Sequence, residues 1–292
     1  MKDFALLIGN DINNIKPGKS WKQLLDDITS YCGVSYINRE DKPFPMLYEE
    51  IFLSAIRTRM MDEKDLKSYI AKIVSEIDQN EIHERIRSLG VSHIMTTNYE
   101  FSIEGFTPKS NNSLVAEKLY SIFRKHEKDE TTYWHIHGDC NNPISINLGY
   151  EHYCGQLQNM RNYTLTGTNY KTEGILKESL VRRLTNEEIV NYQSWIDLFF
   201  TKDIYIFGLG LDFVESDLWW LLTYRARSKY YKTRFQINNK ITYFIPSEYE
   251  GRSRSKLEIL KANDVIVISL ASKNKFDYYT SVLNEIDKSS EK

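Results

Sequence analysis

Short apolar runs alternate with longer amphipathic stretches along the chain. Each apolar run is about as long as a buried strand, and the runs cover residues 4–9, 93–99, 133–138, 204–210, 241–246 and 265–270. Strands that are apolar throughout are typical of a parallel sheet covered on both faces. Their alternation with helical patterns predicts an α/β fold.

Helical spacing dominates the chain between the first two predicted strands. Leu24, Leu25 and Ile28 repeat at this spacing after Ser20, which is a suitable N-cap residue, and similar patterns follow over 47–56 and 66–73. This is more helix than one crossover needs, so we expect a helical lobe over 20–90. Residues 150–200, rich in Tyr, Asn and Thr, predict an insertion of mixed helix and loop.

The last third of the chain has a simpler pattern. Helices are expected from about residue 214, over 253–262 and over 276–288, between the last predicted strands. We interpret residues 1–292 as a single domain.

Composition excludes several classes of protein. The 292 residues are 41% hydrophobic and 27% charged, which excludes wholesale disorder. The net charge of −2 argues against a protein that coats nucleic acid. Apolar runs stay far below the roughly 20 residues of a membrane span, and the first residues lack a signal-peptide pattern. We therefore expect a cytoplasmic protein without a membrane partner.

The cysteines and histidines give no metal-binding pattern. Cys32, Cys140 and Cys154 are far apart and form no CxxC motif, so a four-cysteine zinc module is impossible. His135 and His137 alternate on a predicted strand and point to opposite faces, which disfavours a shared metal. His137, beside Gly138, is the better candidate for a site, and His135 for an interior histidine.

Polar residues follow four of the predicted strands. In open α/β sheets, ligands bind outside the carboxyl ends of the strands, and glycine there lets the backbone approach a phosphate or ribose. Four such ends that lie together predict a nucleotide-sized site. The segments are Gly9-Asn10-Asp11, Thr97-Asn98-Tyr99-Glu100, His137-Gly138-Asp139 and Gly208-Leu209-Gly210.

Other motifs are incomplete. Gly18-Lys19-Ser20 resembles the end of a P-loop, but Asn13 stands where its first glycine belongs. The basic run over 225–234 is interpreted as a solvated helix end, so nucleic-acid binding by the chain alone is not expected. Residues 150–235 carry several aromatic side chains that either pack locally or form a contact surface, namely Tyr163, Tyr170, Trp195, Tyr230 and Tyr231.

Four motifs occur in an order that resembles a known family. LLIGND near the N-terminus, TTNYE at 96–100, WHIHGD at 134–139 and FGLGLDFVESDLWW at 207–220 are similar to the sirtuin-like NAD-hydrolase domains of prokaryotic anti-phage defence systems. The resemblance extends from about residue 4 to 270. It implies a Rossmann-like parallel sheet with a helical second lobe and NAD bound in the cleft. The missing zinc module disfavours protein deacylation and favours cleavage of NAD.

The resemblance also assigns residues. Asn98 and His137 match the catalytic asparagine and histidine of the family, and Glu100 stands where sirtuins have an aspartate near nicotinamide. His137 would take a proton from water or a ribose hydroxyl, and Asn98 would hold that water or the ribose. The remaining expected NAD-binding residues are Gly9, Asn10, Asp11 and Thr97, with Gly208, Gly210 and Asp217 toward the adenosine end.

The expected function is hydrolysis of NAD, the substrate, to nicotinamide and ADP-ribose. The resemblance implies gating by a partner or ligand, with a homo-oligomer or a companion defence protein as partner. The alternative is a catalytically silent sensor or accessory subunit that binds NAD or ADP-ribose. The form of the ADP-ribose product, linear or cyclic, is left open.

Overall fold

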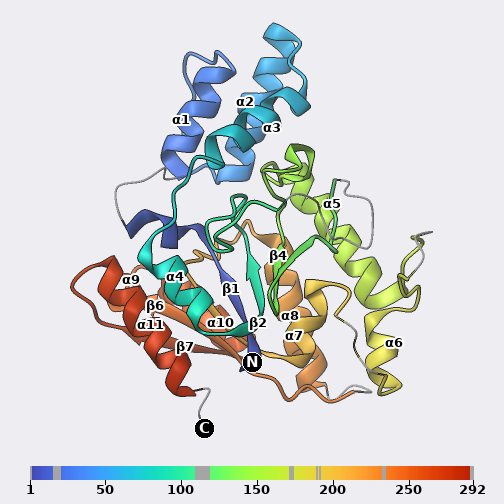
Figure 1. The fold of residues 1–292 in the computed structure, drawn as a ribbon. Helices are drawn as coiled ribbons and strands as arrows, with labels where there is room; N and C mark the ends of the chain where they lie inside the picture. The colour runs from blue at the N-terminus through green and yellow to red at the C-terminus, as the bar shows by residue number, and fades with distance from the viewer. Residues whose placement is uncertain are drawn as a thin grey trace.

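A seven-stranded sheet forms the centre of the molecule (Figure 1). The computed structural model describes residues 2–15, 21–108, 119–170, 174–188, 190, 192–231 and 235–289. The strands are β1 (Lys2–Ile8), β2 (Val91–Thr96), β3 (Lys125–Lys128), β4 (Thr131–His135), β5 (Asp203–Phe207), β6 (Ile241–Pro246) and β7 (Val265–Leu270).

The strand order is β3-β4-β2-β1-β5-β6-β7. Neighbours pair in parallel, except that β3 pairs antiparallel with β4 at the edge. Without β3, the parallel strands numbered along the chain read 3-2-1-4-5-6, which is the Rossmann order. The predicted α/β class with a mainly parallel sheet is therefore confirmed, and the order reverses between β1 and β5.

Helices cover both faces of the sheet, so its central strands are buried. Ala5 and Leu7 of β1 face one apolar core, together with side chains of α8 (Ser216–Tyr230) and α10 (Arg254–Ala262). Leu6 and Ile8 face the other core, with α4 (Glu81–Ser88) and α11 (Lys275–Ser289). The alternation of side chains along a strand divides β1 between these cores.

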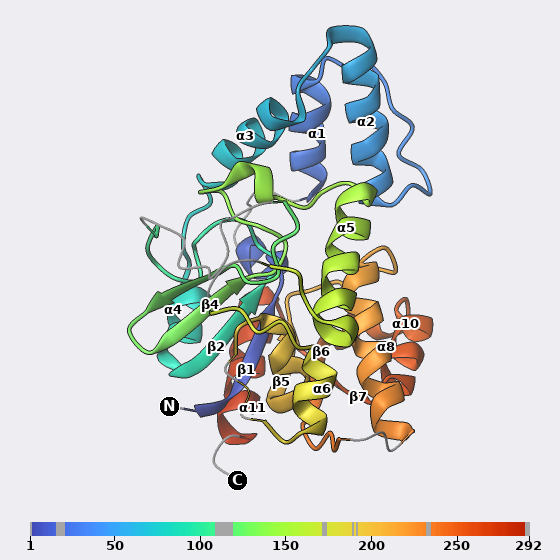
Figure 2. The same ribbon diagram turned by 90° about the vertical axis from the view of Figure 1, so that its right-hand side faces the viewer.

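Three helices stand together beyond the carboxyl ends of the strands (Figures 1 and 2). They are α1 (Trp21–Tyr31), α2 (Phe44–Arg59) and α3 (Glu63–Val74), and they share a third apolar core. Asp62 caps α3, and the capping box of Asn80 starts α4, which packs on the sheet instead. The predicted range 20–90 thus includes a helix outside this group, and Ser20 lies outside the described residues.

Residues 150–200 contain short helices and irregular chain. The helices are α5 (Tyr150–Arg161), a π-helical turn (Asn162–Thr166), α6 (Leu180–Thr185), a 3-10 turn (Trp195–Asp197) and α7 (Leu198–Thr201). Tyr163 and Trp195 are fully buried, and the Tyr163 hydroxyl donates to Asp197. These two aromatic residues therefore pack locally, whereas Tyr230 and Tyr231 are exposed.

The remaining short elements are the 3-10 helices Asn10–Ile15 and Pro143–Ser145 and α9 (Ser247–Glu250). Within the described ranges, every helix is too short or too polar to span a bilayer.

Candidate active site

A cavity of about 880 Å³ opens at the carboxyl ends of the strands. Its wall includes residues after β1, β2, β4, β5 and β6, so it lies where the strand order reverses between β1 and β5. In doubly wound sheets this is the position of the ligand crevice. Of the predicted site residues, the cavity is lined by Asn10, Asp11, Thr97, His137, Gly208 and Gly210.

The loops after β1 and β5 touch at the base of this crevice. A Cβ atom on Gly9 would lie 2.4 Å from the carbonyl oxygen of Gly208, so only glycine fits there. The backbone N–H of Asp11 donates to that carbonyl at 3.0 Å. Gly208 has φ +67, a left-handed conformation that favours glycine. Gly9 thus shapes the crevice without lining it.

The β5 loop is held by hydrogen bonds to its successive carbonyl oxygens. The Tyr243 hydroxyl donates to Leu209 at 2.9 Å, and Lys256 Nζ donates to Gly210 at 2.5 Å. Together with the bond from Asp11 to Gly208, these contacts fix the loop beside the cavity.

His137 and Asp217 form a buried pair at the cavity wall. His137 follows β4, and Asp217 lies in the first turn of α8. His137 Nε2 lies 2.8 Å from Asp217 Oδ2. A carboxylate only accepts hydrogen bonds, so the neutral imidazole carries its proton on Nε2 and has its lone pair on Nδ1. Burial alone would lower the pKa of His137, but Asp217 outweighs it and the pKa is raised.

The position of Asp217 differs from the role expected for it. The family resemblance implies a contact with the adenosine end of NAD, whereas the side chain of Asp217 is fully buried against His137 and does not line the cavity.

Asn98 and Glu100 lie behind the cavity wall, which is formed by their neighbours Thr97 and Tyr99. Asn98 Nδ2 donates to Glu100 Oε1 at 3.0 Å, and Asn13 Nδ2 donates to the same oxygen at 2.7 Å. Burial raises the pKa of Glu100 against the opposing effect of the hydrogen bond from Asn13. Asn98 Oδ1 is buried without a hydrogen-bond partner, which leaves one acceptor of this side chain unused.

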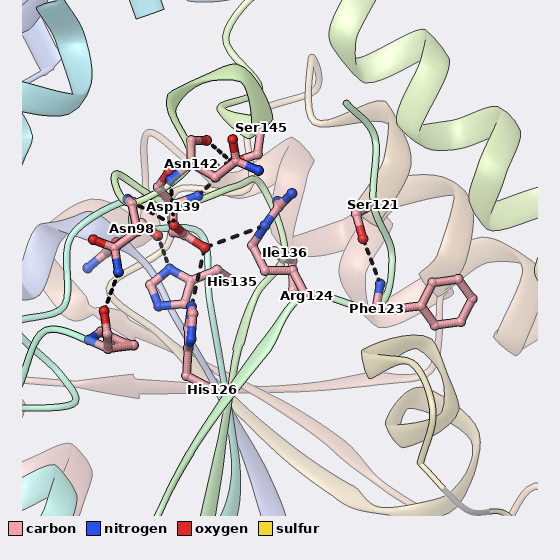
Figure 3. A network of polar contacts seen from close by, with 12 residues as sticks. Asn98, Ser121, Phe123, Arg124, His126, His135, Ile136, Asp139, Asn142 and Ser145 are labelled. Carbon is pink, nitrogen blue, oxygen red and sulfur yellow. Dashed lines mark hydrogen bonds and ion pairs between the residues drawn. The ribbon is translucent and has the colours of Figure 1, made fainter. Parts of the chain in front are cut away.

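A polar network holds the ends of β2 and β4 together (Figure 3). His135 Nδ1 lies 2.9 Å from the carbonyl oxygen of Asn98, and its Nε2 lies 2.6 Å from Glu104 Oε1. Burial alone would lower the pKa of His135, but the effect of Glu104 is larger and raises the pKa to about 9. The protonated imidazole therefore donates at both nitrogens. His135 is also fully buried, which confirms it as an interior histidine. Asp139 contacts His126 Nε2 at 3.2 Å in the same network.

The carboxylate of Asp11 is tied to the C-terminal helix. It accepts hydrogen bonds from Lys275 Nζ at 2.5 Å and from the Tyr279 hydroxyl at 2.6 Å. Asn10 and Asp11 both line the cavity, so α11 helps to position this wall.

Glu215 is a cavity residue that the sequence analysis missed. Burial raises the pKa of its carboxyl to about 7 against the opposing effect of His137. Its Oε2 is buried without a hydrogen-bond partner. The available signal was its place two residues before Asp217 in the segment after β5.

The cavity wall also carries cationic side chains that the sequence patterns did not reveal. Arg252 and Lys256 line the cavity, together with Ser253 and Ser255. Cationic and hydroxyl side chains are suited to phosphate oxygens. The described ranges contain no group of three or more His, Cys, Asp or Glu residues that could hold a metal ion.

Comparison with known proteins adds no assignment. No protein-family model matches the chain, and no curated protein matches it in sequence.

Proposed function

We propose that the chain hydrolyses NAD to nicotinamide and ADP-ribose. The observation that carries the proposal is His137 in the wall of a cavity, paired with the buried Asp217, at the point where a Rossmann-ordered sheet reverses its strand order. The crevice at such a point suits a dinucleotide, and the pair supplies a base beside it.

NAD would lie along the cavity with its nicotinamide ribose toward His137. The diphosphate would approach the backbone of the loops after β1 and β5, where Gly208 keeps the chain close. Arg252 and Lys256 would balance its charge from the side of α10.

The reaction breaks the bond between the ribose anomeric carbon and the nicotinamide nitrogen. Nicotinamide departs as a neutral molecule, so the transition state needs a placed water and stabilisation of a cationic ribose. His137 Nδ1 accepts a proton from the water or a ribose hydroxyl, and general-base catalysis of this kind contributes about 10²–10⁴-fold. Asp217 fixes the imidazole proton on Nε2 and stabilises the imidazolium that forms.

In this proposal, two further side chains assist the hydrolysis. Ionised Glu215 stabilises the developing positive charge on the ribose from the cavity wall. Asn98 Oδ1 is buried behind Thr97 and Tyr99 without a protein partner, so a shift of that wall would let it accept a hydrogen bond from the attacking water or a ribose hydroxyl.

Unchecked hydrolysis of NAD would harm the cell that makes the enzyme. We therefore propose a gated anti-phage defence effector in the cytoplasm, whose slow basal hydrolysis of NAD is increased by a ligand, self-association or a companion protein. Its substrate is NAD, and the reaction needs no metal.

A sensor that binds NAD or ADP-ribose without cleaving it is the second candidate. The observation that favours it is the position of Asn98, which is bonded to Glu100 and does not line the cavity.

Product analysis separates the two candidates. The purified chain is incubated with NAD, and nicotinamide and ADP-ribose are quantified by chromatography while NAD binding is followed by calorimetry. Hydrolysis predicts equal amounts of the two products. Binding of NAD with complete recovery of intact NAD would contradict hydrolysis by this chain and favour the sensor.

A further inference from the structure

The outward face of α2, with the residue that follows the helix, carries partly exposed apolar side chains. Met46, Leu53, Ile56 and Met60 are 43%, 60%, 41% and 91% exposed. The opposite face of the helix packs into the core shared by α1–α3. A surface helix normally presents polar side chains on the side away from its core, so this exposed stripe needs an explanation.

One polar side chain interrupts the stripe. Glu49 follows Met46 by three residues and precedes Leu53 by four, so it lies on the same face, where it accepts a hydrogen bond from the backbone N–H of Glu151 at 3.2 Å. The spacings from Met46 to Leu53, Ile56 and Met60 follow the seven-residue repeat of helix pairs. At a rise of about 1.5 Å per residue, the stripe is about 20 Å long. Its uninterrupted part runs from Leu53 to Met60, and contiguous exposed apolar surface marks an interaction site.

Charged side chains beside the stripe are arranged to suit a second copy of the same helix. Glu50 precedes Leu53 by three residues, and Arg57 follows it by four. In an antiparallel pair centred near Leu53, Glu50 of each copy would approach Arg57 of the other. A parallel pair would bring like charges together.

We propose that two copies of the chain associate through α2, antiparallel about a two-fold axis near Leu53. A two-fold interface uses the same patch on both copies and must be complementary to itself. The stripe meets this requirement because it has opposite charges beside it. Glu50 contacts Lys42 at 2.6 Å within one chain. That pair is exposed and contributes little, so it does not prevent the new contact.

The proposed interface is connected to the cavity. Phe44 and Pro45, at the start of α2, line the cavity. Association through the outer face of α2 would therefore act on a helix that forms part of the cavity wall. This consequence for activity rests on the proposed function, but the association itself does not.

Light scattering coupled to size-exclusion chromatography tests the association without any activity assay. Wild type at about 100 µM should show about twice the chain mass of 34.4 kDa, and Leu53→Glu should show the mass of one chain. Ile56→Glu should also dissociate the dimer. Ile259→Glu on α10 is the matched control, because Ile259 has the same exposure of 41% and should leave the dimer intact.

Charge exchange tests the antiparallel arrangement. Glu50→Arg and Arg57→Glu should each weaken the dimer about tenfold, and the double variant should recover it because both intermolecular pairs are restored. Circular dichroism confirms that each variant is folded. A monomeric wild type, a dimer that survives Leu53→Glu, or a double variant weaker than both single ones would overturn the proposal.

Discussion

His137 and Asp217 are the residues on which the proposed chemistry depends most directly. Their side chains come from different parts of the chain and meet at 2.8 Å beside the cavity. The carboxylate sets both the tautomer and the raised pKa of the imidazole. The pair therefore predicts how activity should change with pH.

Asp217→Asn should move the acid limb of the kcat/KM profile to lower pH. A base must be deprotonated to act, and without the carboxylate, burial lowers the pKa of His137. Glu215 also faces His137 and remains in the variant. The rate at the optimum should fall by about 10²-fold or more, because the tautomer is no longer fixed. Profiles measured between about pH 5 and pH 9 that coincide for variant and wild type would contradict this role.

Glu215→Gln should stabilise the protein at alkaline pH. The folded carboxyl has a pKa of about 7, above the value of 4.5 for the free group. The folded state therefore holds a proton that the unfolded state loses, and stability falls as the pH rises from about 4.5 to about 7. Since glutamine does not titrate, the variant should gain about 3 kcal/mol at pH 8 and little at pH 4. Urea unfolding at both pH values measures this difference, and an equal gain at both would exclude the ionised carboxyl as its cause.

At the scale of elements, the crevice depends on the contact between the loops after β1 and β5. The length and apolar character of the two strands identify both loops in the sequence, because each loop follows a buried apolar run. Their contact depends on β1 and β5 being neighbours in the sheet, which local patterns do not specify. The edge strand β3 is missed for a different reason, because Lys125–Lys128 is polar and has no apolar period.

Gly9→Ala should destabilise the protein by about 1–3 kcal/mol, because its Cβ would overlap the Gly208 carbonyl. Gly210→Ala is the matched control. A Cβ there would lie 3.7 Å from the nearest atom, which is ordinary contact, so its stability should stay near that of wild type. Urea unfolding compares the variants, and an unchanged free energy of unfolding for Gly9→Ala would contradict the close packing of the two loops.

At the scale of the whole molecule, the sequence predicts the sheet better than the site. The apolar runs fall on β1, β2, β4, β5, β6 and β7, because buried strands leave a local signal. The site joins His137 to Asp217 across 80 residues and Asp11 to Lys275 across 264. Such contacts arise from strand order and helix packing. A sequence motif therefore indicates His137 as a site residue but does not show which side chain it contacts.

The most direct test of the account compares nicotinamide release from NAD by wild type and His137→Ala. His93→Ala is the control, since His93 lies on β2 and does not line the cavity. The account predicts release by wild type and by the control, and a loss of about 10²-fold or more in His137→Ala. Release by His137→Ala at the wild-type rate, with the variant folded, would contradict the central claim.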